Sequence, residues 1–268
     1  MKWLVFVIVY FGSVICYAQE ISICSWNIKD FGNSKNEIEV EFIANTLKTF
    51  DIIAIQEVVA GRGGAQAVAR LSDKLNRKGA KWDYLVSPAT SGSSHSRERY
   101  AFLWKTKVVK VLDKGFLVEK LSGLIDREPF ICRFKIYGKT LTMLTFHATT
   151  KAKQPEMEIK YFKYLDLLYN TKDWIMAGDF NLSQSHSVFN PLKKQGIIPA
   201  LIRQKTSLKQ KAINGEHLAS ELDNIFYSQA AFKLLRSGII ATYKHFPELK
   251  KAREISDHVP IYVRLILR

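Results

Sequence analysis

Short apolar runs that lead into a polar side chain recur along this sequence and predict buried strands. In residues 174–177 the run is Trp-Ile-Met-Ala, and Gly178, Asp179 and Asn181 follow it closely. A short continuous apolar run that ends at a glycine is typical of a strand buried in a sheet. The sequence therefore predicts a strand that carries a carboxylate and an amide just beyond its end.

Polar side chains stand in corresponding places on other predicted strands. The runs at residues 21–26, 51–56 and 141–146 lead into Asn27, Glu57 and His147. Later the order is reversed, since Asp223 precedes the strand at 225–227, and Asp257 and His258 precede the strand at 259–263. In a sheet with antiparallel neighbours, such strand ends can lie on one edge. We therefore expect one cleft lined by Asn27, Glu57, His147, Asp179, Asn181, Asp223, Asp257 and His258.

The rest of the pattern alternates helices with strands. The apolar spacing of one helix face predicts helices over residues 36–50, 65–77 and 157–169. Further strands are predicted over residues 82–86, 100–104, 108–113, 129–137 and 139–146. Residues 186–220 are basic and are predicted to be irregular, covering one end of the cleft. This order predicts an α/β fold in which two mixed β-sheets pack face to face with helices outside.

Length and charge limit the classes of protein to consider. The chain has 268 residues and a formal net charge of +15. The length suits one large α/β domain, and because no long linker divides the chain, we expect residues 19–268 to form a single domain. A positive field attracts polyanions such as nucleic acid or anionic lipid, although it can also serve solubility alone. Beyond residue 18, Cys24 and Cys132 fit either one disulfide or two buried thiols.

Residues 1–18 have the pattern of a secretory signal peptide. Lys2 precedes an almost wholly apolar stretch over residues 4–15, and Ala18 is a small residue at the expected cleavage site. The stretch is short for a membrane span of about 20 residues, so a cleaved signal is favoured over an uncleaved anchor. We therefore expect a secreted or periplasmic protein without stable membrane association.

Each polar motif alone has an ordinary structural explanation, but their order along the chain is specific. Gly178-Asp179-Phe180-Asn181 alone fits a turn, and Ser256-Asp257-His258 alone fits a helix cap. Together the motifs resemble the endonuclease/exonuclease/phosphatase superfamily, and within it the deoxyribonuclease I branch is the most similar. The resemblance covers about residues 21–265 and rests on Trp26-Asn27-Ile28, Ile55-Gln56-Glu57-Val58, Arg97-Glu98-Arg99-Tyr100, Arg127-Glu128-Pro129, His147 and the two motifs above.

The resemblance implies a four-layer α/β sandwich that hydrolyses phosphodiester bonds in DNA. It implies that Asn27, Glu57 and Asp257 hold Mg²⁺ or Mn²⁺ through hard oxygen ligands. It also implies two histidine–carboxylate pairs, in which one histidine takes a proton from water and the other protonates the leaving oxygen. The residues implied in catalysis are Glu98, His147, Asp179, Asn181, Asp223 and His258. Those implied in substrate binding are Arg127, through a two-pronged bond to phosphate, and Asn181.

The sequence departs from the family pattern on the surface that contacts DNA. Ser96 and Val59 stand where the resemblance implies an aromatic side chain and an arginine that read the minor groove. Leu218 and Ser220 stand where a threonine-rich calcium-binding stretch is implied, and the family disulfides are absent. The catalytic centre therefore matches well, whereas bound Ca²⁺ is not supported by the sequence.

We therefore expect a secreted, divalent-metal-dependent endonuclease that cleaves DNA with little sequence specificity. Double-stranded DNA is the expected substrate and a monomer the expected state. One alternative is a secreted phosphodiesterase of the same superfamily that acts on lipid head groups, like a sphingomyelinase. An exposed aromatic hairpin would favour that reading. The other is a non-catalytic module that binds polyanions, which would tolerate loss of a metal carboxylate or a histidine.

Overall fold

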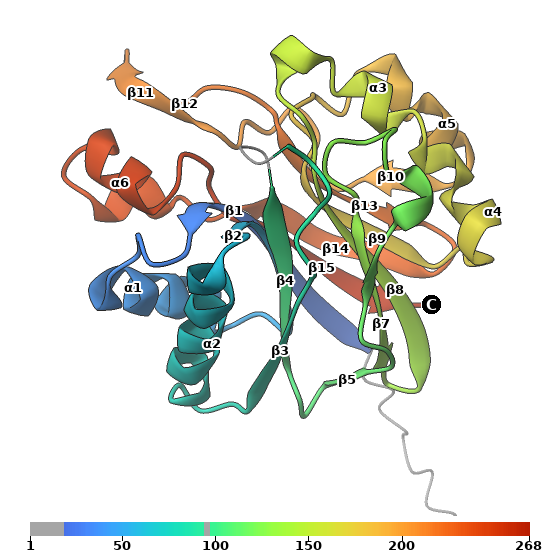
Figure 1. Cartoon of the computed structure of the whole chain (residues 1–268), viewed down its shortest axis with the longest axis horizontal. Helices are drawn as coiled ribbons and strands as arrows, with labels where there is room; N and C mark the ends of the chain where they lie inside the picture. Colours follow the sequence, from blue (N-terminus) through green and yellow to red (C-terminus); the bar gives the residue numbers. More distant parts are fainter. Residues whose placement is uncertain (1–18, 94–96) are drawn as a thin grey trace, which may run out of the picture.

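Two large β-sheets face each other and carry helices on their outer surfaces (Figure 1). This computed structural model describes residues 19–93 and 97–268. The predicted signal peptide, residues 1–18, lies outside the described residues, as does Ser96. The predicted fold, an α/β sandwich of two mixed sheets with outer helices, is confirmed.

The first sheet has six strands in the order β14-β15-β1-β2-β4-β3. Strands β1 and β2 are parallel, and every other neighbouring pair is antiparallel. Parallel neighbours need a crossover, which helix α1 (Glu37–Leu47) provides between β1 and β2. The strands span Glu20–Phe31 (β1), Ile52–Val59 (β2), Trp82–Val86 (β3), Glu98–Lys105 (β4), Phe232–Ile239 (β14) and Ile261–Leu267 (β15).

The second sheet has seven strands in the order β10-β13-β9-β8-β7-β5, with β6 paired to β7. Its one parallel pair is β8 with β9, so the carboxyl ends of these two strands meet at the same edge. The antiparallel strand β13 begins at that edge. The strands span Val109–Val111 (β5), Phe116–Leu117 (β6), Phe130–Ile136 (β7), Lys139–His147 (β8), Trp174–Asp179 (β9), Ile197–Pro199 (β10) and Asp223–Ser228 (β13).

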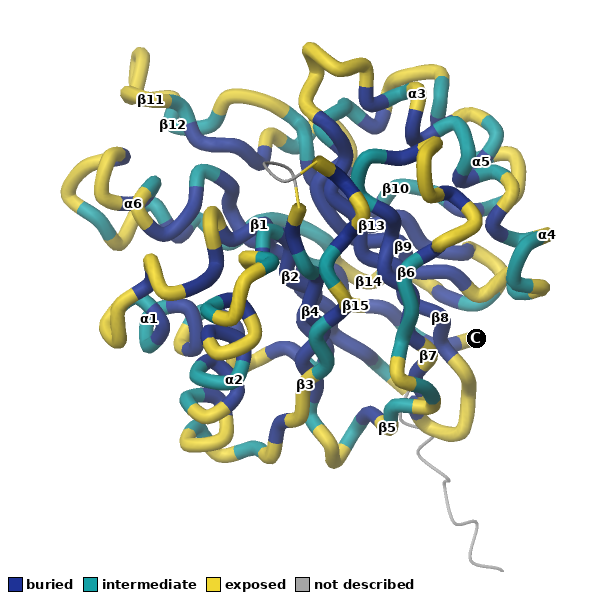
Figure 2. The backbone as a smooth tube through the Cα atoms, viewed as in Figure 1, coloured by how far each residue is buried: buried dark blue, intermediate teal, exposed yellow. Residues whose placement is uncertain are grey.

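Three apolar cores hold the layers together. The core between the sheets includes Phe102 of β4 and Phe134 of β7. A second core joins α1 and α2 (Arg62–Asn76) to the first sheet, and a third joins α3 (Glu156–Ile159), α4 (Leu165–Tyr169) and α5 (Asn190–Lys194) to the second. Figure 2 shows the central strands buried, while the outer surfaces of the helices and most loops are exposed. Burial on both faces explains why these strands read as continuous apolar runs.

The prediction that residues 186–220 are irregular was wrong. Phe189 and Leu192 of this segment are buried, and it contains α5, β10 and a hairpin of β11 (Leu208–Ile213) and β12 (Glu216–Leu218). Asn214 and Gly215 form its two-residue turn with φ of 52° and 76°. Asn-Gly between strands is a strong hairpin signal, so the sequence did carry this information.

Two other elements differ from the sequence pattern. The helix predicted over residues 157–169 is split into α3, the 3₁₀ turn Phe162–Tyr164 and α4. Helix α6 (Leu249–Ile255) follows the 3₁₀ turn Thr242–His245 and packs on Leu208 and Val259. The remaining 3₁₀ turns are Glu119–Leu121, Lys151–Lys153 and Ser187–Phe189.

Cys24 and Cys132 are both free buried thiols. Cys24 packs in the core under α1 and α2, and Cys132 packs in the core between the sheets. Of the two alternatives left open by the sequence, the structure therefore has the buried thiols. In the described ranges, no helix has the length and apolar character needed to cross a membrane.

Candidate active site

The candidate site lies where edges of the two sheets meet, and strand register brings its side chains together. In the second sheet, His147 at the end of β8 pairs in register with Asp179 at the end of β9. Asp179 also pairs in register with Asp223, the first residue of β13. From the first sheet, the amide Nδ2 of Asn27 in β1 donates to Asp179 Oδ2 at 3.1 Å. The two sheets therefore contribute to one site.

His147 is held by Glu98. Its Nδ1 lies 2.9 Å from Glu98 Oε2, and its backbone N–H donates to the hydroxyl of Tyr100 at 3.3 Å. Burial alone would lower the pKa of His147, but the charge of Glu98 and its hydrogen bond raise that pKa above the ordinary value. Glu98 therefore fixes the imidazole and favours its protonated form.

His258 is held in the same way by Asp223. Its Nδ1 lies 2.7 Å from Asp223 Oδ2, and its carbonyl oxygen accepts from Trp26 Nε1 at 2.9 Å. The Ser256 hydroxyl accepts from the backbone N–H of His258 at 3.0 Å. Burial opposes the charged ring, but the nearby Asp223 and Asp179 raise the pKa of His258 to about 10. Each histidine thus has a carboxylate on Nδ1 and leaves Nε2 for chemistry.

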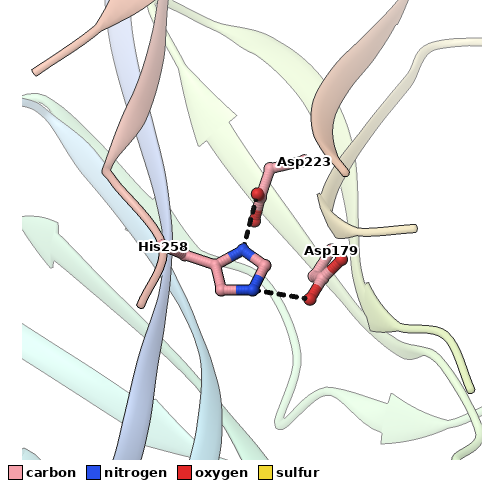
Figure 3. A group of neighbouring side chains, drawn as sticks. All are labelled: Asp179, Asp223 and His258. Atoms are coloured by element: carbon pink, nitrogen blue, oxygen red, sulfur yellow. Dashed lines mark hydrogen bonds and ion pairs between the residues drawn. The ribbon is translucent and has the colours of Figure 1, made fainter. Parts of the chain in front are cut away.

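The carboxylate of Asp179 lies close to both histidine rings. Its Oδ2 lies 3.5 Å from Nε2 of His147 and 3.5 Å from Nε2 of His258. Figure 3 shows the ring of His258 between Asp223 and Asp179, with one ring nitrogen facing each carboxylate. Burial would raise the pKa of Asp179, but His258 and His147 lower it overall. For Asp223, burial prevails and raises the pKa. Asp179 therefore carries the negative charge between the two rings.

Asn27 and Glu57 form the part of the site best suited to a cation. Asn27 Nδ2 donates to Glu57 Oε1 at 2.9 Å, while Asn27 Oδ1 is buried and has no hydrogen-bond partner among the described residues. A buried acceptor without a partner is costly, and a hard cation beside a carboxylate would satisfy it. These residues therefore fit a divalent metal.

The strand geometry at Glu57 differs from the expected strand end. Strand β1 continues beyond Asn27 to Phe31, and β2 continues beyond Glu57 to Val59. The pairing of β2 shifts register around Glu57 on both sides, and Glu57 has φ of 59°. Such bulges redirect side chains next to active sites, and a non-glycine residue with positive φ marks local strain. The bulge, rather than a strand end, presents the Glu57 carboxylate.

A second group could also hold a metal ion. Ligand atoms of Asp179, Asp223 and His258 lie within 4.8 Å of one another. Both ring nitrogens of His258 face carboxylates in this group, and a ring that is protonated cannot ligate a metal through the same nitrogen. The raised pKa of His258 thus makes Asn27 and Glu57 the better cation site.

Two residues implied in substrate binding lie at the edge of this cluster. Arg127 donates from Nε to the His147 carbonyl at 2.9 Å and from Nη2 to the Ala148 carbonyl, and Nη1 lies 3.4 Å from Glu98 Oε2. These contacts use three of the five guanidinium N–H groups, so two remain for a phosphate. Asn181 has φ of 50°, and its Nδ2 also donates to Ala148 O, at 3.0 Å.

Asp257, the third implied metal ligand, has a charged partner of its own. Its carboxylate forms an ion pair with Arg253 at 3.2 Å and is about one-third exposed. Its backbone carbonyl accepts from Leu208 N at 2.7 Å. The structure therefore gives Asp257 a structural contact of its own, and its role in metal binding stays a prediction.

Sequence reasoning missed the polar side chains that position the site residues through hydrogen bonds. The hydroxyl of Thr206 donates to Asp223 Oδ2 at 2.6 Å, and it lies in the segment predicted to be irregular. Gln56 Nε2 donates to Ser25 Oγ at 3.1 Å and to Thr145 Oγ1 at 2.7 Å, joining the two sheets. A polar residue inside an apolar strand run was the available signal for Gln56. No pattern marked Thr206.

The geometry agrees with the comparison to known families. The sequence profile of the Endonuclease/Exonuclease/phosphatase family matches residues 24–258. The chain belongs to this family, and it is therefore a hydrolase of the class that cleaves phosphate esters.

Similar curated proteins are deoxyribonucleases. Deoxyribonuclease-1-like 1 of Bos taurus is 27% identical, with 93% of this chain and 82% of that protein covered. Deoxyribonuclease gamma of Homo sapiens is 26% identical, with 92% and 87% covered. A deoxyribonuclease of Thioalkalivibrio sp. is 27% identical, with 91% and 70% covered. The resemblance to the deoxyribonuclease I branch is therefore confirmed.

Solved structures show the same fold. An endonuclease/exonuclease/phosphatase family protein from Bacteroides thetaiotaomicron has a TM-score of 0.69 at 16% identity, covering 94% of this chain and 99% of that chain. TDP2 of D. rerio, solved with a single strand DNA product, has a TM-score of 0.64 at 17% identity, covering 92% and 98%. Their sequences are too distant to carry more than the fold.

Proposed function

We propose that this protein is a secreted, divalent-metal-dependent endonuclease that hydrolyses phosphodiester bonds in DNA with little sequence specificity. One observation carries the proposal: Asp179 Oδ2 lies 3.5 Å from Nε2 of both His147 and His258. Each ring is held at Nδ1 by its own carboxylate. Two imidazoles directed at one point can take a proton from water and deliver another to the leaving oxygen.

The chain's own residues account for the proton transfers. Hydrolysis of a diester needs one neutral imidazole to accept the proton of the attacking water and one imidazolium to protonate the leaving sugar oxygen. Glu98 and Asp223 keep each ring in the orientation that exposes Nε2, and they stabilise the charged form. Asp179 stabilises imidazolium between the rings. Arg127 would hold a phosphate oxygen with its two remaining N–H groups.

Asn27 and Glu57 would hold Mg²⁺ or Mn²⁺. Such an ion, when bound, stabilises the negative charge that develops on the phosphoryl oxygens. The structural support for this assignment is Oδ1 of Asn27, which is buried and accepts no hydrogen bond from any residue that the structure describes. Asn27 also bonds to Asp179, so the cation site adjoins the histidine pair.

Two features of the sequence support the finer parts of the proposal. The net charge of +15 supplies phosphate contacts that do not depend on base sequence, which favours low specificity. The pattern of residues 1–18 supports export from the cell. The similar deoxyribonucleases support DNA as the substrate. Double-stranded DNA and a monomeric enzyme remain the expected form of substrate and protein.

The test is cleavage by the purified chain from residue 19 onward. Supercoiled plasmid, RNA and sphingomyelin are each incubated with Mg²⁺ and with EDTA. We expect the plasmid to be nicked in the presence of Mg²⁺ and to stay intact in EDTA. His147→Ala should slow the nicking by about 10²- to 10⁴-fold, whereas His186→Ala, at an exposed histidine outside the cluster, should not. Hydrolysis of sphingomyelin with intact plasmid would replace this proposal with the lipid phosphodiesterase.

A further inference from the structure

A long groove runs beside the candidate active site, outside the cluster of catalytic side chains. It has a volume of about 1100 Å³ and lies between the hairpin β11–β12, helix α6 and the chain that follows Asn27 in β1. Figure 1 shows the hairpin and α6 projecting on the same side of the molecule. Pockets for compact ligands measure about 300–1000 Å³, so this volume suits an extended ligand. We call it the hairpin groove; its lining includes Lys29, Asp30, Lys211, His217, Tyr243 and Lys250.

Both walls of the hairpin groove begin at the site. Asp30 lies in one wall, and its backbone N–H donates to Glu57 Oε2 at 3.2 Å. The hairpin forms the other wall, and at its base Ser207 pairs with His258 in an antiparallel bridge. A polymer bound at the Glu57 and His258 side chains would therefore continue directly into the groove.

An aromatic pair lines the hairpin groove. The rings of His217 on β12 and Tyr243 on the 3₁₀ turn Thr242–His245 have centroids 5.0 Å apart and an interplanar angle of 21°. Both residues are half-buried, and Tyr243 packs against the small core of α6 and the hairpin, which fixes its ring. Stacking of an unpaired base on such a ring strengthens binding by about 5- to 150-fold per base.

The charges of the hairpin groove favour an anionic strand only modestly. Within residues 19–93 and 97–268, Lys29, Lys211 and Lys250 form no ion pair, whereas Lys35 donates to the Glu254 carbonyl and Arg253 pairs with Asp257. Of the acidic groups, Glu39 caps α1 and Glu254 pairs with Lys251, which leaves Asp30 and Glu248. Three uncommitted lysines therefore face two uncommitted carboxylates. Stacking, more than charge, must select the ligand.

We propose that the hairpin groove binds a single-stranded segment that continues from double-stranded DNA on one side of the scissile phosphate. Unpaired bases expose the ring faces that His217 and Tyr243 can stack on, whereas a duplex conceals them. Lys211 and Lys29 contact the phosphates of that strand. This inference rests on the proposed function for the position of the scissile bond, but not for the binding itself.

The test separates binding in the groove from chemistry at the site. The variants are His217→Ala, Lys211→Gln and Tyr243→Leu, the last of which keeps an apolar side chain on the α6 core. Binding of a fluorescent single-stranded oligonucleotide of about 20 nucleotides is measured in EDTA by anisotropy. Hydrolysis of bis(p-nitrophenyl) phosphate, which is too small to reach the groove, is measured with Mg²⁺. Tyr164→Leu, at an exposed tyrosine directly before α4 that does not line the groove, is the matched control.

We expect His217→Ala and Tyr243→Leu each to weaken single-strand binding about tenfold. Lys211→Gln should lower the slope of log K against log salt by about 0.7. All three variants should hydrolyse the small diester at the wild-type rate, and Tyr164→Leu should change neither readout. Single-strand binding unchanged in all three variants would overturn the proposal, as would a loss confined to duplex binding. A wild-type chain that binds the strand in EDTA but cleaves no diester would refute the proposed function and leave the groove assignment standing.

Discussion

Asn27 Nδ2 donates a hydrogen bond of 3.1 Å to Asp179 Oδ2, and this bond crosses from one β-sheet to the other. The same amide nitrogen donates to Glu57, so its orientation is set by two carboxylates. The amide oxygen is then buried, and none of the residues that the structure describes bonds to it. The bond thus joins the residues suited to a cation to the residues suited to proton transfer, and the function depends on how the two sheets are held.

Replacement of Glu57 by glutamine should weaken metal binding selectively. Glutamine keeps the shape of the side chain but removes the charge that a divalent cation needs. We expect Mg²⁺ affinity, measured by titration calorimetry, to fall at least tenfold. Replacing a residue that only hydrogen-bonds to a metal ligand already lowers metal affinity by about 10- to 100-fold. The thermal midpoint in EDTA should stay near the wild-type value, because Glu57 is only half-buried.

Glu39→Gln provides the control for that experiment. Glu39 lies near the start of α1 and accepts from Asn36 N at 2.8 Å, a bond that glutamine can also accept, so the substitution removes a charge but no cation ligand. Mg²⁺ affinity should be unchanged in this variant. Equal Mg²⁺ affinities in Glu57→Gln and the wild type would remove Glu57 from the metal site.

The raised pKa of His258 makes a prediction about stability and pH. The pKa is about 10 in the folded chain and about 6.5 in an unfolded one, so the folded chain binds the proton more tightly. The resulting stabilisation is complete below about pH 6.5 and is lost as the pH rises through about 10. In EDTA, the difference in thermal midpoint between wild type and His258→Gln should therefore be largest at and below about pH 6.5 and should narrow towards pH 10.

His186→Gln is the matched change at an exposed histidine. Its thermal midpoint should follow that of the wild type throughout the same pH range. A gap between wild type and His258→Gln that stays constant with pH would show that His258 titrates at its ordinary value.

The two histidines should be distinguishable by the leaving group of the substrate. His147→Ala and His258→Ala should each lower DNA cleavage by about 10²- to 10⁴-fold, the usual contribution of one general acid or base. A diester of thymidine with p-nitrophenol has a leaving group that needs no protonation. The variant that lacks the general acid should recover on this substrate, and the variant that lacks the base should not.

Two further variants check that the histidines act in one step. The double variant should be far less impaired than the product of the single variants, because both groups serve the same transition state. Glu98→Gln should resemble a milder His147→Ala, since it removes only the charge 2.9 Å from the ring. Recovery of both single variants on the nitrophenyl diester, or of neither, would contradict the division into an acid and a base.

The sequence predicted the sheet strands and the site edge because both depend on local pattern. Strands buried on both faces read as apolar runs, and parallel pairing of β8 with β9 places the residues after those runs side by side. The sequence predicted that His147 and Asp179 share an edge, and the structure shows that parallel pairing makes them neighbours. Their specific pairing with Glu98 and Asp223 came from the family resemblance, and the structure places these partners at hydrogen-bond distance.

What the sequence did not yield depends on contacts between distant segments. The bulge that presents Glu57 arises from how β1 and β4 pair around it, and no residue type at that position requires it. Thr206 supports Asp223 from a segment with no regular pattern. Arg127 was expected to bind phosphate, and the structure shows it donating to the carbonyl oxygens of His147 and Ala148 at the end of β8. Such contacts join segments that are far apart in the sequence, so they can be identified only from the three-dimensional structure.

Thr145 provides the test of how the sheets position the site. Its hydroxyl accepts from Gln56 Nε2 at 2.7 Å in the core between the sheets, and both residues are fully buried. Gln56 directly precedes Glu57, and Thr145 lies two residues before His147. Thr145→Val keeps the shape of the side chain but leaves an amide N–H with one partner fewer, which should destabilise the fold by about 1–3 kcal/mol.

The same substitution should affect catalysis if this bond holds the cation site in register with the histidine pair. At a temperature well below unfolding, we expect Thr145→Val to lower kcat for the small diester by about tenfold, because a misplacement of less than 1 Å is costly to catalysis. Thr145→Ser, which restores the hydroxyl, should recover most of kcat even if its stability stays low, since it still lacks the methyl group. A matched loss of core volume elsewhere, Ile225→Val, should lower stability without changing kcat. Equal kcat values for Thr145→Val and Ile225→Val would show that the Gln56–Thr145 bond contributes to stability alone.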